Sequence, residues 1–301
     1  MSAPRIGVDI GGTKVDAVVL GDDDALLARH RMAVTRGAEG VIASACEAVA
    51  QVTADAGIQV TDAAGVGIGI PGAVRGGVVE HALNLDVERL ALADVLRERW
   101  RVPVTVENDV NVAALGAWHL LGDGPSSVAY LNVGTGLAAG LILDGRLWRG
   151  GRGAAGEIGH ISIDPAGPVG ADGLPGGLET YASGSGMVQQ WGHEGAAAVD
   201  VLAAARAGDA RAQEIRAGLM HGVATAVRVL VLTLDVDRVM LGGGLTGLRY
   251  ELLDGARRVI RGWEAASPFL GSLDMGARIV LAPHGEPIAA IGAAKLEVDR
   301  G

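Results

Sequence analysis

The sequence has little cysteine and no long apolar run, and each shortage excludes a class of protein. Cys46 is the only cysteine among 301 residues, so no disulfide can form within the chain and no multi-cysteine metal site exists. The longest apolar stretch, 223–234, contains Arg228 and is too short to cross a bilayer. The N-terminus lacks the charged and apolar segments of a leader peptide, so we expect a cytoplasmic protein without membrane contact.

Lysine is also scarce, and positive charge is nowhere concentrated. Only Lys14 and Lys295 are lysines, and the formal net charge is −10 with an isoelectric point of about 5.1. Since no basic stretch interrupts this acidity, we expect no nucleic-acid partner. The acidity itself is typical of a solvated surface. Lys14 differs from a surface lysine because it lies inside a glycine-rich loop.

Glycine and apolar residues, by contrast, are abundant. The 48 glycines cluster in short loops between apolar runs, which is typical of backbone that approaches a ligand closely. Hydrophobic residues make up 49% of the chain, enough for a sizeable core, and the length predicts about two domains.

Two segments of the sequence share one pattern. Residues 7–22 read GVDIGGTKVDAVVLGD and residues 130–145 read YLNVGTGLAAGLILDG. Each is a strand with Asp or Asn near its end, a Gly/Thr turn and an apolar return strand. We interpret the match as an internal repeat that supplies two phosphate-binding loops across one cleft. The alternative is that two hairpins resemble each other by chance.

Periodicity and turn signals predict the remaining elements. Strands are expected over 25–34, 65–70, 102–106, 236–241 and 277–281, helices over 39–56, 87–100, 187–190, 197–207, 210–234, 250–263 and 288–298, a further helix from about 109, and an irregular loop over 150–186.

The first glycine loop has residues suited to a phosphate group. The backbone amides of Gly11 and Gly12 can point at an anion without a Cβ in the way. Thr13 adds a hydroxyl donor and Lys14 a cation, while Asp9 can hold Mg²⁺ directly or through water. The loop matches neither a Walker A motif nor a dinucleotide-binding loop.

Two other glycine turns are weaker candidates. Gly134, Thr135 and Gly136 form the second loop of the repeat, and we expect them to bind phosphate as well. Three glycines at 242–244 follow a strand, where Gly243 and Gly244 either let a nucleotide lie against bare backbone or form a flexible turn.

Asp109 ends a predicted strand and begins a predicted helix. A carboxylate at this place can accept the proton of a substrate hydroxyl as its oxygen attacks phosphorus. Asn108 beside it can donate to and accept from another hydroxyl. The alternative is that Asp109 or Asn108 only caps the helix.

Three further polar residues lie in the glycine-rich loop. Glu157 and His160 suit a polyhydroxyl ligand, which needs both acceptors and donors, although such a pair can also bind a metal ion. Glu179, taken alone, reads as a surface charge.

Together these segments resemble the ROK family of sugar kinases and sugar-responsive repressors, within the actin-like ATPase superfamily. The matching pieces run in family order over nearly the whole chain: 9–14 (DIGGTK), 69–72 (GIPG), 84–85 (NL), 107–111 (ENDVN), 134–136 (GTG), 156–160 (GEIGH), Glu179 and 242–244 (GGG).

The resemblance implies an α/β protein with a two-domain actin-like, or ribonuclease H-like, fold, duplicated β-sheet cores and a central cleft. We place a small domain at 1–112, completed by a C-terminal helix at 286–301, and a large domain at 113–285. The resemblance further implies a homodimer that binds ATP with Mg²⁺ and a sugar.

The same resemblance assigns roles to single residues. Asp109 would be the catalytic base, and the loops at 11–13 and 134–136 would hold phosphates. Gly243 and Gly244 would lie against the adenosine. Sugar hydroxyls would be contacted by Asn84, Asn108, Glu157, His160 and Glu179.

The sequence departs from the family pattern in two places. Many members have a cysteine-rich zinc motif before the position of Glu179, where this chain has Gly170, Asp172 and Gly177, so we expect no structural zinc. The tryptophan that often follows the Asn-Leu pair is also missing. The repressors of the family carry an N-terminal helix-turn-helix domain; because the first strand begins almost at the start of this sequence, we expect no such domain here.

Glucose is the expected acceptor, in a transfer that would yield glucose 6-phosphate. An N-acetylhexosamine such as N-acetylglucosamine or N-acetylmannosamine, or fructose, is the near alternative, because such kinases share the motifs. Two functions of other classes stay open: a sugar sensor without catalysis, and an ATPase or phosphotransferase with a different acceptor.

Overall fold

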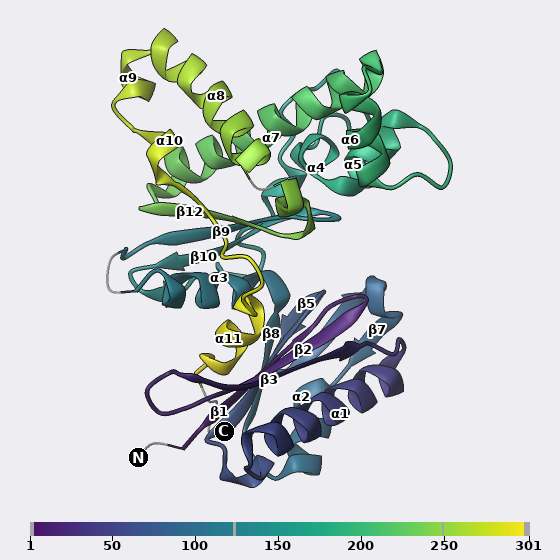
Figure 1. The fold of residues 1–301 in the computed structure, drawn as a ribbon, viewed down its shortest axis with the longest axis vertical. Helices are drawn as coiled ribbons and strands as arrows, with labels where there is room; N and C mark the ends of the chain where they lie inside the picture. The colour runs from purple at the N-terminus through teal and green to yellow at the C-terminus, as the bar shows by residue number, and fades with distance from the viewer. Residues whose placement is uncertain (1–2, 123–124, 249, 298–301) are drawn as a thin grey trace. The chain divides into compact units, whose positions relative to one another are not determined.

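The chain forms two compact units in a computed structural model that describes residues 3–122, 125–248 and 250–297. Unit 1 contains 3–122, 147–154 and 284–297, and unit 2 contains 125–146 and 155–283. Figure 1 labels most of the helices and strands of the two units.

Unit 1 is built on a five-stranded sheet of order β3-β2-β1-β4-β8. The strand β1 is antiparallel to β2 and parallel to β4, and β4 is parallel to β8. The carboxyl ends of β1, β4 and β8 therefore meet at one edge of the sheet. The strands span Arg5–Ile10 (β1), Lys14–Leu20 (β2), Leu26–Ala33 (β3), Gly65–Ile70 (β4) and Val104–Asn108 (β8).

Helices cover both faces of this sheet. On one face Ile6, Val8 and Ile10 pack in a core with α1 (Ala38–Ala56), which ends at Gly57 in a left-handed conformation, as predicted. The other face is covered by α11 (Ile288–Ala294), which lies so close that Gly7 has no room for a Cβ. The helix α3 (Asp109–Leu120) crosses α11 equally closely.

A small antiparallel sheet of order β5-β6-β7 completes unit 1, and it corrects the helix predicted over 87–100. Only Leu92–Trp100 is helical (α2), whereas Val87–Leu90 is strand β7. Val87 and Leu90 pair with β6 (Val78–Ala82), which buries Val87, and this pairing decides a short segment that periodicity leaves ambiguous. The third strand is β5 (Ala73–Arg75).

Unit 2 repeats the sheet of unit 1. Its order is β11-β10-β9-β12-β13, in which β9 is antiparallel to β10 and parallel to β12. The predicted repeat is therefore present as two hairpins in the same place of two similar sheets. The strands span Val128–Val133 (β9), Leu137–Leu143 (β10), Arg146–Leu147 (β11), Arg238–Gly242 (β12) and Ile279–Leu281 (β13).

Helices of unit 2 form its core around α7 (Ala210–Leu234). This helix is long and apolar enough to cross a membrane by length and composition alone, and half of its apolar stretch is buried in unit 2. Leu219, Val223 and Val227 are among the buried residues, so core packing accounts for its hydropathy. The other helices are α4 (Leu178–Ala182), α5 (Gly184–Trp191), α6 (Ala198–Arg206), α8 (Tyr250–Ala266), α9 (Pro268–Gly271) and α10 (Met275–Arg278).

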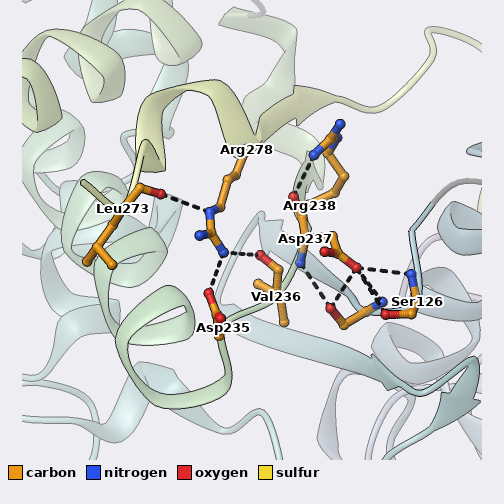
Figure 2. A network of polar contacts seen from close by, with 8 residues as sticks. Ser126, Asp235, Val236, Asp237, Arg238, Leu273 and Arg278 are labelled. Atoms are coloured by element: carbon orange, nitrogen blue, oxygen red, sulfur yellow. Dashed lines mark hydrogen bonds and ion pairs between the residues drawn. The ribbon is translucent and has the colours of Figure 1, made fainter. Parts of the chain in front are cut away.

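A polar network ties the start of β12 to its neighbours (Figure 2). Asp237 accepts hydrogen bonds from the amides and hydroxyls of Ser126 and Ser127, at 3.0–3.2 Å. Arg278 donates to Asp235 Oδ1 at 2.7 Å and to the carbonyl of Val236 at 2.9 Å. The hydrogen bonds from Ser127 and Ser126 hold the pKa of Asp237 below its ordinary value, against burial.

Three further boundaries differ from expectation. The units divide at 124/125 rather than 112/113, because α3 packs on α11 within unit 1. The expected loop over 150–186 contains α4, the start of α5 and a short 3-10 helix, Ile158–His160. The final helix ends at Ala294; Val298 lies outside the described residues.

Candidate functional site

Two carboxylates, Asp9 and Asp109, lie near enough at the carboxyl edge of the unit 1 sheet for the charge of one to affect the other. Asp9, at the end of β1, is opposite Gly69 of β4 in the parallel register. Gly69 has no side chain, and a Cβ there would contact Val112 and lie 3.7 Å from Asp109 Cα. A side chain at position 69 would therefore collide with Val112 and disturb the start of α3 beside Asp109.

Asp9 resists ionisation in this environment. Burial is the largest cause, and the negative charges of Asp109 and Asp16 add to it, so its pKa rises from 3.8 to about 7. Lys14 and Arg31 oppose the rise. A carboxylate held at this cost is stabilised by a cation placed beside it, which suits Asp9 to a divalent metal ion.

The turn after β1 keeps its amides available. Gly11 donates its amide to the carbonyl of Lys14 at 2.9 Å and closes the turn. Within the described ranges, no recorded hydrogen bond uses the amide of Gly12 or Thr13. A Cβ on Gly12 would lie 3.3 Å from Asn84 Cβ, so this loop and Asn84 are neighbours. Lys14 is exposed at the start of β2.

The helix α3 is capped by Asn108, not by Asp109. Asn108 Oδ1 accepts from the amides of Val110 at 2.9 Å and Asn111 at 3.2 Å, and its Nδ2 donates to the carbonyl of Gly72 at 3.2 Å. Asp109 is the first helical residue and is partly buried, and its Oδ1 accepts from the Val110 amide at 3.0 Å. The cap therefore fixes the Asp109 backbone, and the capping function falls to Asn108.

Glu107 supports the same helix start from the buried side. Its Oε1 accepts from the amide of Asn108 and from Asn111 Nδ2, both at 2.9 Å, and its Oε2 accepts from Arg149 Nε at 2.5 Å. The residue is 7% exposed. Glu107 is thus a positioning residue that sequence reasoning did not single out, although it belongs to the matched segment 107–111.

Unit 2 carries a small pocket beside its glycine hairpin. Gly134 and Thr135 accept the amides of Gly184 and Ser185 at 2.8 and 3.1 Å, which seats the start of α5 on the loop. The pocket has a volume of about 620 Å³, and Gly244 forms part of its wall with open space around its Cα. A planar base and a ribose fit bare backbone of this kind.

The second half of this pocket was not predicted from the sequence. Its remaining walls come from α5 and α6 and from the residue after Gly244: Ser185, Val188, Gln189, Ala198 and Leu245. The Ser-Gly-Ser-Gly run at 183–186 is a signal that could have indicated it. Gly243 does not line the pocket; its φ of +88° turns the chain beside Val133.

Glu179 lies between two glycines of unit 2. Its Oε2 accepts the amide of Leu137 at 2.8 Å, and a Cβ on Gly136 or Gly159 would meet the Glu179 side chain. The side chain is therefore held at the end of the glycine hairpin rather than being a solvated surface charge.

Glu157 and His160 lie at the two ends of the 3-10 helix Ile158–His160, and both are exposed. His160 Nδ1 is 3.3 Å from Asp172 Oδ2, and the Leu174 amide and His160 lower the pKa of Asp172. In the part of the chain that the structure describes, no group of three His, Cys, Asp or Glu residues is placed to hold a metal ion. The donor set around His160 does not fit a zinc site.

Within each unit, several of the residues predicted to form the site lie close together. Unit 1 brings together the turn at 11–13 with Asn84, and Asp9 with Asp109. Unit 2 brings together Gly134, Thr135 and Gly244 at the pocket, and Gly136 with Glu179 and the Ile158–His160 turn.

Two similar five-stranded sheets, each with a glycine hairpin at the same position, define a two-unit α/β protein of the actin-like ATPase fold. The chain belongs to the ROK family, whose sequence model matches residues 5–300. The resemblance found in the sequence and the predicted fold class are therefore confirmed.

Three known kinases are similar to this chain. A ROK hexokinase from Thermus thermophilus is 31% identical with a TM-score of 0.80, over 97% of this chain and 96% of that one. A ROK glucokinase from Streptomyces griseus, solved with glucose and AMPPNP, is 30% identical with a TM-score of 0.75, over 97% and 98%. An N-acetylmannosamine kinase from Yersinia pseudotuberculosis is 31% identical, over 80% of this chain and 82% of the length of that kinase.

Proposed function

We propose that this protein is an ATP-dependent sugar kinase that transfers the γ-phosphoryl group of ATP to a hexose hydroxyl. The observation that carries the proposal is the place of Asp109, a partly buried carboxylate at the edge where three parallel strands end, with its backbone fixed by the Asn108 cap. The hexokinase and glucokinase relatives support the reaction class, and the AMPPNP complex of one relative supports ATP as donor.

Asp109 acts as the base in this proposal. Its carboxylate accepts the proton of the sugar hydroxyl while that oxygen bonds to the γ-phosphorus and the bond from this phosphorus to the bridging oxygen of ADP breaks. Positioning supplies most of such catalysis, which is why the cap and Glu107 matter.

Asn84, Asn108, Glu157, His160 and Glu179 are the proposed contacts of the sugar hydroxyls. Asn108 Nδ2 has a second N–H beside the one given to Gly72, and that group can donate to a hydroxyl. Glu179 keeps Oε1 for the sugar, since its recorded hydrogen bond uses Oε2.

Each unit contributes a proposed part of nucleotide binding. The amides of Gly12 and Thr13, with Lys14, and the loop at 134–136 would hold phosphates, and the pocket at Gly244 would hold the adenosine. Asp9 would hold Mg²⁺, which neutralises charge on the phosphates when bound. We further propose a cytoplasmic homodimer that contacts neither membrane nor nucleic acid.

Glucose is the proposed acceptor, and N-acetylmannosamine is the second candidate because a kinase for that sugar is equally similar in sequence. The test is ADP release with MgATP across glucose, mannose, fructose, N-acetylglucosamine, N-acetylmannosamine and no sugar. Release that depends on one sugar supports the proposal and names the acceptor. Release without sugar indicates an ATPase, and sugar binding without release indicates a sensor.

The base is tested by Asp109→Asn, which keeps the shape of the side chain and removes the proton acceptor. We expect sugar and ATP binding to persist while turnover falls by about 10²-fold or more. Asp254→Asn, at an exposed position of α8, is the matched control and should leave turnover unchanged. Near wild-type turnover of Asp109→Asn would remove Asp109 as the base.

A further inference from the structure

A second, larger cavity lies within unit 1, along β8 from Val104 to Glu107. Its volume is about 1340 Å³, and five arginines line it: Arg75, Arg97, Arg101, Arg149 and Arg152. We call it the arginine cavity. Its only lining carboxylates among the described residues are Asp94 and Glu107, so it is positive in a protein whose net charge is −10.

The arginines come from separate segments of unit 1. Arg75 ends β5, Arg97 lies in the last turn of α2, and Arg101 follows α2 as its C-cap with φ +60°. Arg149 and Arg152 belong to the glycine-rich loop 149–153. Arg97 and Arg101 lie near the C-terminus of α2, where a positive charge interacts favourably with the helix dipole. The other three arginines lie at no helix C-terminus, so the dipole does not explain them.

Three of these guanidinium groups are anchored. Arg97 donates to Asp94 Oδ1 at 2.8 Å and to the carbonyl of Val104 at 3.2 Å. Arg149 is paired with Glu107, and Arg75 donates to the carbonyl of Arg152 at 3.3 Å. The contacts recorded for the described part of the chain include none from the guanidinium of Arg101 or Arg152. The guanidinium groups of Arg101 and Arg152 are therefore available to bind an anion.

The loop 149–153, Arg-Gly-Gly-Arg-Gly, adds backbone donors to the same wall. None of its amides donates a hydrogen bond among those recorded for the described ranges. A Cβ on Gly151 or Gly153 would meet nothing within 4 Å, so the backbone there is open to a ligand. The cavity is also lined by apolar residues, among them Val102, Pro103 and Val104.

We propose that the arginine cavity binds a small organic phosphate. Guanidinium groups recognise phosphate through paired N–H···O bonds, and free amides add to such a site. The apolar lining suits the organic part of the ligand, and the volume exceeds what one phosphate group fills. The site is separate from the proposed sugar and nucleotide contacts, and the inference does not rest on the proposed kinase activity.

The test is calorimetric titration of the full chain with glucose 6-phosphate and with inorganic phosphate. Saturating glucose and MgAMPPNP are present in one series, so that the proposed substrate sites are occupied, and are omitted in a second. The variant Arg101→Ala/Arg152→Ala removes the two unanchored guanidinium groups. The control Arg258→Ala/Arg261→Ala removes the same charge from exposed positions of α8 in unit 2.

In the series with glucose and MgAMPPNP, we expect binding of glucose 6-phosphate that weakens at least tenfold in the cavity variant and stays unchanged in the control. In the series without them, a further binding event common to all variants identifies product binding at the proposed kinase site. Tighter binding of the sugar phosphate than of inorganic phosphate would show that the organic part is recognised, whereas equal binding would identify inorganic phosphate as the ligand and overturn the organic-phosphate assignment. The proposal is also overturned by absence of binding to the wild type, or by equal weakening in both double variants, which indicates unspecific charge attraction. Failure of the sugar panel above leaves these outcomes unaffected.

Discussion

Asp9 and Asp16 are opposite each other on β1 and β2 and have opposite pKa shifts, which yields a sharp prediction. Burial raises the pKa of Asp9 to about 7, with Asp109 and Asp16 adding to the rise. Asp16 is also buried, but hydrogen bonds from Arg29 and Arg31 outweigh that burial and hold its pKa below the ordinary value. Replacing each by asparagine should therefore change stability in opposite directions.

The sign for Asp9 follows from proton linkage. Between pH 3.8 and about 7 the folded state keeps a proton that the unfolded state has lost, so wild-type stability falls as pH rises through this window. The full rise corresponds to about 4 kcal/mol at 1.36 kcal/mol per pH unit. Because Asp9 is only partly buried, we expect about half of it, roughly 2 kcal/mol, to be measured.

Asp9→Asn removes this cost because asparagine cannot ionise. In urea titrations with a chelator present, the variant should be about 2 kcal/mol more stable than wild type at pH 8, and the difference should vanish near pH 4. Asp16→Asn is the matched comparison and should lose about 2 kcal/mol at pH 8, because Arg29 and Arg31 lose the buried carboxylate with which they pair. That loss should disappear as pH falls through the lowered pKa of Asp16.

Two results would refute the reasoning about Asp9. One is an Asp9→Asn variant less stable than wild type at pH 8, which would mean that the ionised carboxylate is stabilised in the fold. The other is a difference that stays constant from pH 4 to 8, which would mean that no proton is linked to it.

Three further predictions concern packing, the Figure 2 network and metal dependence. Gly292→Ala places a Cβ against the Val112 carbonyl and should lower the free energy of unfolding by about 1–3 kcal/mol. Gly262→Ala, in an open part of α8, should raise it by up to about 1 kcal/mol. Chemical denaturation that ranks the two variants the other way would contradict the packing. Asp237→Ala should cost about 1–2 kcal/mol at pH 7, and this cost should shrink as the pH falls through the lowered pKa of Asp237, where the wild-type carboxylate becomes protonated. A loss independent of pH would contradict this. A zinc chelator should leave activity intact once Mg²⁺ is restored, because among the described residues His160 belongs to no group of three metal-binding side chains. Loss that only zinc restores would overturn this.

The sequence predicted best those features that depend on neighbouring residues. The repeated hairpins and the end of α1 at Gly57 follow from local turn chemistry, and both are present. The strand Val87–Leu90 was missed because its pairing partner β6, and not its own periodicity, decides its structure. Likewise, sequence alone left open which residue caps α3, since that depends on where Asn108 Oδ1 points.

For the candidate site, too, the sequence predicted the local motifs and missed the residues that tertiary contacts bring in. Glycine loops and Asp109 are visible as motifs, whereas Glu107 and the walls from α5 and α6 become relevant only through tertiary contacts. The pKa of Asp9 could not be derived from the sequence, because it depends on burial and on Asp109, which is distant along the chain.

The helix α11 packs into unit 1 through positions where Gly7 and Gly67 leave no room for a side chain. During synthesis on the ribosome, this helix emerges long after the strands that it covers. Unit 1 therefore exposes one apolar face, including Val18 and Leu20, until residues near 297 have been translated. At about 5–20 residues per second this delay lasts roughly 10–35 seconds, and unit 2, whose segments end at 283, can complete its fold first.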